Sequence, residues 1–247
     1  MSSLVGLKTP MITAALNSHI EVIRILAQAR VNPNAIAAGP SPIIVDARIS
    51  NWHGHLDATR LLLDAGASAS TEAGRTSPLT EAARDGHTEI VRCLLRAGAN
   101  VDNQSRMSTP LAEASRMGHI NVMRLLIGAK ANLTPSGMGN DLFSPLALAI
   151  KYNHPKVVEI LIDAGAPGFL SGSFGKQDCF SHDSVSYNAA AYGSTEVLEM
   201  LIYRGFDVNK FDERAQTTIS HAADWGNMGA TTLIVTLFRK CQPLSLH

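Results

Sequence analysis

The sequence predicts an all-α solenoid of about seven helix–loop–helix repeats joined by short hairpin loops. The first observation is a recurring pattern: residues 77–99 read SPLTEAARDGHTEIVRCLLRAGA, and residues 109–131 read TPLAEASRMGHINVMRLLIGAKA. The second is the apolar composition, because hydrophobic residues make up 45% of the chain but aromatic residues only 5%. Small and aliphatic side chains favour closely packed helices. The third is a set of glycines that returns at the same places in the pattern.

The first helix of each repeat is predicted from its cap and its small residues. A Ser or Thr caps the helix, and the Pro that follows lies in the first turn, where its missing N–H is harmless. An alanine at one fixed position keeps these helices thin enough to stack: Ala82, Ala114, Ala149, Ala189 and Ala222. Glycine then lets the chain reverse towards the second helix, at Gly86, Gly118 and Gly193.

The second helix of each repeat is predicted to bury one apolar face. Over residues 89–96 that face carries Ile90, Val91, Leu94 and Leu95. Its anchor returns about every 33 residues, at Leu26, Leu62, Leu94, Leu126, Leu161, Leu201 and Ile234. Left-handed caps are expected at Gly66, Gly98, Gly165 and Gly205. Lys130 stands where these repeats place glycine.

This pattern resembles the ankyrin repeat, whose signature is T-P-L-H-x-A-A followed by G-H. The resemblance covers nearly the whole chain and implies a single domain over residues 1–247. Its repeats lie near 5–33, 37–69, 73–101, 105–133, 140–167, 182–209 and 213–240, with insertions near 46–53 and 167–183. It implies a structural role for the histidines of the G-H slot, which hydrogen-bond backbone near the turn: His19, His55, His87, His119 and His154.

One departure from the signature concerns the bonds between repeats. No repeat keeps the histidine of T-P-L-H, whose place is taken by residues such as Thr80, Ala112 and Tyr187. The hydrogen bonding between repeats must therefore be partly replaced by other groups.

Charge and cysteine content exclude several function classes. Lys plus Arg is 21 and Asp plus Glu is 21, so bulk charge does not favour nucleic acid or an anionic membrane as partner. The three cysteines form no CxxC pair, which favours reduced thiols and a cytoplasmic or nuclear location. We see no signal peptide or transmembrane run. No metal or cofactor is expected, because Cys179-x-x-His182 offers only two ligands.

The resemblance implies a protein-binding scaffold that recognises a partner protein or peptide along a concave groove of first helices. Aromatic residues gather just before the turn in the later repeats, where the groove is expected, and Tyr and Trp are favoured at interfaces. Polar residues before the alanine pair suggest a solvated groove, and charges there would tune specificity. The candidate groove residues are Trp52, His53, Arg84, Asp85, Arg116, Met117, Tyr152, Asn188, Tyr192 and Trp225; Lys151 adds a further charge.

Two other interpretations stay open. One is a small-molecule enzyme, in which the insertion at 167–183 closes the groove over the acid–base groups Glu81, Glu113, His221 and Asp224. Against it, the sequence has no catalytic motif. The other is a homodimer through the terminal repeat, whose last helix is apolar over Leu233, Ile234, Val235, Leu237 and Phe238.

Overall fold

The computed structural model describes residues 9–34, 42–43, 53–70, 77–104, 108–134, 144–166, 184–209, 211 and 215–241, with the backbone alone at 53–55, 184 and 238–241. These residues form thirteen α-helices and no β-strand, which confirms the predicted all-α class. Trp52, the side chain of His53 and the insertion at 167–183 lie outside the described residues.

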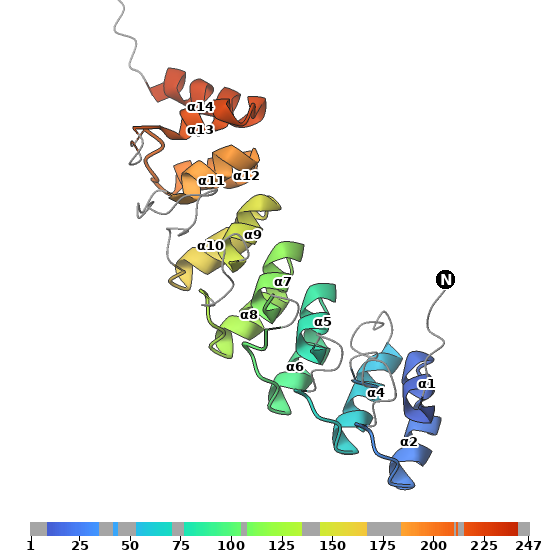
Figure 1. The fold of residues 1–247 in the computed structure, drawn as a ribbon. Coiled ribbons are helices and arrows are strands. Elements are labelled where there is room, and N and C mark those ends of the chain that lie inside the picture. Colours follow the sequence, from blue (N-terminus) through green and yellow to red (C-terminus); the bar gives the residue numbers. More distant parts are fainter. Residues whose placement is uncertain are drawn as a thin grey trace, which may run out of the picture. The chain divides into compact units, whose positions relative to one another are not determined.

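The chain forms two compact units, residues 1–132 and 133–247, each a stack of helices in chain order (Figure 1). The first unit holds α1 (Pro10–Leu16), α2 (Ile20–Gln28), α4 (His53–Asp64), α5 (Pro78–Asp85), α6 (Thr88–Arg96), α7 (Pro110–Met117) and α8 (Ile120–Gly128). The second holds α9 (Pro145–Lys151), α10 (Pro155–Asp163), α11 (Ser184–Tyr192), α12 (Thr195–Tyr203), α13 (Thr218–Asp224) and α14 (Met228–Cys241). The single domain expected from the sequence stays a prediction.

The caps predicted from the Ser/Thr positions are present. In each capped first helix the hydroxyl oxygen accepts a hydrogen bond from the backbone N–H three residues later, as at Ser77 (3.1 Å to Thr80 N) and Thr109 (3.2 Å to Ala112 N). Thr9, Ser144 and Thr217 cap α1, α9 and α13 in the same way. These bonds fix where each first helix begins, because they satisfy a donor that has no partner within the helix.

The core follows the predicted pattern of small first helices and anchored second helices. The five alanines of the first helices are all 0% exposed, and so are six of the seven second-helix anchors. Leu26 is half-buried, because its repeat has no described repeat before it to pack against. Leu95 is half-buried as well, so the prediction that it belongs to the buried face was wrong. The buried face of α6 consists of Ile90, Val91 and Leu94.

Hydrogen bonds tie three of the first helices, α5, α9 and α11, to the repeat that follows. His119, in the G-H slot, places Nε2 3.0 Å from the carbonyl oxygen of Arg84. In the second unit Ser194 occupies this slot and donates from Oγ to the carbonyl of Ile150, while Asn227 donates from Nδ2 to the carbonyl of Ala190 at 2.8 Å. The structural role expected for the slot histidines is confirmed at His119, and the bond crosses between repeats.

The loops after the second helices contribute further bonds between repeats. Asn34 donates to the carbonyl of Gly66 at 2.9 Å and accepts from the N–H of Ser68 at 2.7 Å. Asp102 accepts from the N–H of Asn132 at 2.7 Å. These side-chain-to-backbone bonds join repeats that lack the histidine of the T-P-L-H signature.

The left-handed caps after the second helices lie at the predicted glycines. Gly66, Gly98, Gly165 and Gly205 have φ between 82° and 88°. Lys130 adopts φ 64° in the same position although it carries a side chain. A residue other than glycine is strained in this region of the backbone.

We expect Leu94→Ala to lower the free energy of unfolding by about 2–5 kcal/mol, since the side chain is 0% exposed and its removal leaves a cavity. Urea unfolding followed by circular dichroism measures this loss. A change below about 0.5 kcal/mol, the range of ordinary surface substitutions, would contradict the packing of α6.

Lys130→Gly is expected to leave stability unchanged or to raise it by up to about 1 kcal/mol, because glycine adopts positive φ without strain. Arg30→Gly, at φ 56° in the first repeat, is the matched variant. Thermal melting of both variants checks this, and a clear fall in melting temperature for Lys130→Gly would show that α8 ends differently.

Candidate functional site

The candidate site begins with the residue that ends each first helix, directly before the turn. We call this set the turn-end row: Asn17, His53, Asp85, Met117, Tyr152, Tyr192 and Trp225. In six of the seven repeats this residue is the last of its helix or its C-terminal cap. His53 instead begins the second helix α4, so the turn predicted at Gly54 and His55 is wrong. Trp225 is 53% exposed, Met117 46% and Tyr152 45%. Large apolar side chains in this row therefore remain open to a partner.

The second unit carries the aromatic part of the row. Tyr152, Tyr192 and Trp225 end α9, α11 and α13, which pack side by side in that order. The backbone around the three turns is equivalent, with φ of 55°, 70° and 65° at Asn153, Gly193 and Gly226. Equivalent backbone on neighbouring helices places the three aromatic residues in one line along the stack.

Two polar groups of this line, the Lys151 ammonium and the Tyr192 phenol, affect what it can bind. Lys151 places Nζ 5.8 Å from the ring centroid of Tyr152, within the range of a cation–π contact. Partial burial raises the pKa of the Tyr192 phenol above its ordinary value. That phenol therefore stays protonated at neutral pH and can donate a hydrogen bond.

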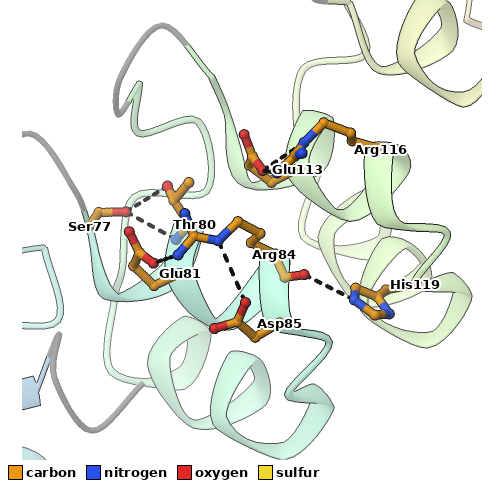
Figure 2. Close-up of polar contacts among 8 residues, drawn as sticks. All are labelled: Ser77, Thr80, Glu81, Arg84, Asp85, Glu113, Arg116 and His119. Atoms are coloured by element: carbon orange, nitrogen blue, oxygen red, sulfur yellow. Dashed lines mark hydrogen bonds and ion pairs between the residues drawn. The ribbon is translucent and has the colours of Figure 1, made fainter. Parts of the chain in front are cut away.

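The first unit carries the charged candidate residues, on α5 and α7 (Figure 2). Arg84 pairs with Glu81 one helical turn earlier, and its Nε lies 3.5 Å from Asp85 Oδ1. Arg116 binds Glu113 Oε2 through Nε at 3.1 Å and Nη2 at 2.6 Å. Both guanidinium groups are thus held by carboxylates of their own helix, while 26% and 31% of the two arginine side chains stay exposed.

The polar row before the alanine pair is solvated in some repeats and buried in others. Thr13 is exposed and Glu113 and His221 are half-buried, whereas Glu81 is 2% exposed and Asn188 8%. The polarity of Glu81 is accommodated by its ion pair with Arg84. Asn188, named as a groove residue, consequently offers little surface to a partner.

The four groups named for an acid–base site are each engaged by a neighbour. Glu81 and Glu113 are ion-paired as above, and Asp224 accepts a hydrogen bond of 2.7 Å from Gln216 Nε2. The His221 ring stacks on Tyr187 with centroids 4.9 Å apart.

The described part of the chain contains no cluster of three or more His, Cys, Asp or Glu side chains suited to a metal ion; Cys179 and His182 lie outside it. None of the described helices combines the length and apolar character that crossing a membrane requires.

Sequence reasoning missed two features of the second helices. Tyr203 ends α12 and is 92% exposed; the signal was its position, since the equivalent residue of α6 is the exposed Arg96. Arg204 joins neighbouring repeats by binding Asp163 at 2.7 Å and Glu159 at 2.8 Å. Its hydrogen bond lowers the pKa of the Asp163 carboxyl.

Comparison with known proteins gives the same architecture. The sequence profile described as "Ankyrin repeats (3 copies)" matches residues 45–136 and 106–170, which together exceed half of the chain. The structure is similar to the ankyrin repeat domain of human ASB11, with a TM-score of 0.72, 23% identity, and coverage of 96% of this chain and 100% of that one.

Two curated relatives are viral. The interferon antagonists OPG040 of Vaccinia virus (strain Western Reserve) and OPG039 of Monkeypox virus are each 28% identical to this chain over 92 residues. The alignments cover 37% of this chain and 29% of each relative.

We expect Glu81→Gln to lower the free energy of unfolding by about 1–3 kcal/mol, because it removes the charge that compensates a partly buried guanidinium. Glu113→Gln is the matched variant with a smaller expected loss, since Glu113 is more exposed than Glu81. Urea unfolding of both proteins measures the difference. Unchanged unfolding of Glu81→Gln together with lost partner binding would assign Glu81 to function instead.

Proposed function

Because the chain belongs to the ankyrin repeat family, we propose that it is a protein-binding scaffold that recognises a partner protein or peptide with its first helices. The observation that carries the proposal is the aromatic part of the turn-end row, where Tyr152, Tyr192 and Trp225 end three consecutive first helices. Tyr and Trp dominate binding energy in many interfaces, because they bury large areas and lose little side-chain entropy.

The first unit carries charged candidate residues of its own. Arg84, Asp85 and Arg116 occupy the two positions before the turn in α5 and α7, with Met117 beside them. Ion pairs on their own helices restrain both guanidinium groups, so a partner would order less side chain on binding. Charged groups of this kind mainly set specificity and association rate.

Cellular location and oligomeric state are also part of the proposed function. An intracellular location, expected from the cysteine content, and a homodimer through the last repeat are further parts of it. The dimer is supported by Met228 and Val235 of α14, which are 81% and 36% exposed. Antagonism of interferon is not carried over from the poxvirus relatives, because the alignments span 29% of those proteins.

Trp225→Ala is expected to abolish capture of the partner, since it removes the most exposed aromatic side chain of the turn-end row. Its effect on stability should stay within about 0.5 kcal/mol, the range of ordinary surface substitutions. Immobilised protein is incubated with cell lysate, and retained proteins are identified by mass spectrometry. Tyr203→Ala is the matched control, because Tyr203 is a more exposed aromatic residue on a second helix.

A protein retained by the wild type and by Tyr203→Ala, but lost from a folded Trp225→Ala, would support the proposal. Identical retention by all three proteins would contradict it.

A further inference from the structure

The spacing of the aromatic residues in the second unit restricts what can bind them. We call Tyr152, Tyr192 and Trp225 the aromatic ladder. Its helices are held together near the turns by the bonds from Ser194 to Ile150 and from Asn227 to Ala190. Packed helices lie about 8–10 Å apart, and the three positions are equivalent. Side chains of the ladder therefore recur about every 8–10 Å.

A partner must present one contact to each member of the ladder at that interval. A β-strand rises about 3.3 Å per residue, but residues three apart point to opposite faces. A polyproline II helix has about 3 residues per turn and rises about 3.1 Å per residue, so every third residue returns to the same face after about 9 Å. In an α-helix, which rises about 1.5 Å per residue, positions on one face that are seven residues apart lie about 10.5 Å apart. Polyproline II matches the ladder with the shortest segment.

The chemistry of the ladder favours the same conformation. Tyrosine and tryptophan offer a flat apolar ring and a polar tip, through the phenol O–H and the indole N–H. A polyproline II segment has no internal hydrogen bonds, so its carbonyl groups remain available as acceptors. The carbonyl groups of an α-helix are used within the helix. Proline rings dock on aromatic grooves at low entropic cost, because the segment is already ordered.

Charges at the two ends of the ladder complete the match. Lys151 precedes Tyr152 and lies exposed over its ring. Asp224 precedes Trp225 and is exposed at the other end. A carboxylate of the partner would pair with Lys151, and a guanidinium would pair with Asp224 while stacking on Trp225.

We propose that the aromatic ladder binds a proline-rich segment in the polyproline II conformation, with proline at every third position, a carboxylate at its Tyr152 end and an arginine at its Trp225 end. This inference rests on the proposed scaffold function and names the chemical class of the partner. It gives each member of the ladder one proline or arginine contact.

The test uses two capped, fluorescently labelled peptides of identical composition, each beginning with aspartate and ending with arginine. One carries three prolines at every third position with alanine between, and the other carries the same three prolines at every second position, with the remaining alanines placed after them. Fluorescence anisotropy with the full chain is expected to give affinity at least about tenfold tighter for the first peptide, a difference of about 1.4 kcal/mol. Both peptides have the same charge, so the comparison isolates the spacing.

Three variants locate the binding site. Trp225→Ala is expected to weaken binding of the every-third peptide about tenfold or more, whereas Tyr203→Ala leaves it unchanged. Asp224→Lys is expected to weaken binding several-fold, and to have no effect on the same peptide ending in alanine, because only the arginine pairs with Asp224. Thermal melting confirms that all three variants are folded.

Equal affinity for the two peptides, or binding that Trp225→Ala does not change, would overturn the proposal. Absence of peptide binding would also overturn it. If lysate capture still depends on Trp225 in that case, the scaffold function stands and the partner has another chemistry, for which an amphipathic helical peptide is the next probe. If neither assay depends on Trp225, the scaffold proposal falls with it.

Discussion

The structure depends on close contact between each turn and the first helix of the preceding repeat. The His119 ring lies so near the preceding turn that a Cβ built on Gly86 would stand 2.6 Å from its Cε1 atom. A Cβ on Gly193 would likewise stand 2.9 Å from Asn227 Oδ1. At both turns glycine avoids this close approach and adopts positive φ without strain. Since the repeats of a solenoid contact only their neighbours, such contacts recur along each unit and together support it.

This contact requires a hydrogen-bond donor more than it requires a particular residue. His119, Ser194 and Asn227 have different sizes, yet each reaches a carbonyl near the end of the preceding first helix. Histidine in the G-H slot is thus one solution among several. The histidine of T-P-L-H is missing, but other side chains bond the backbone: the hydroxyl of Ser77 accepts from the first turn of its own helix, and Asn34 bonds the loop of the next repeat. The side chain that donates the hydrogen bond therefore differs between repeats, while the stacking of the helices stays the same.

The sequence predicted the fold well because its signals are local. A capping Ser77, a buried Ala82 and a left-handed Gly98 each depend on a few neighbouring residues, and each is found where it was expected. Burial of polar residues was harder to predict, since it depends on pairing. Glu81 has the character of a surface residue, but Arg84 three positions later forms an ion pair that allows its burial. The sequence did not predict the exposure of Tyr203, because the groove was expected on the first helices and Tyr203 ends a second helix.

Stability and recognition are assigned to different positions of the same short helix. In α5 the middle of the helix carries the buried Glu81 and Ala82, and its end carries the exposed Asp85. The end position holds an acid in α5, a thioether in α7, and an aromatic residue in α9, α11 and α13. Such different side chains are tolerated because the backbone of the turn, set by positive φ at the next residue, is the same in each case. The chemistry presented to a partner can therefore change at one residue per repeat without altering the packing, which is why the turn-end row is where binding specificity is expected.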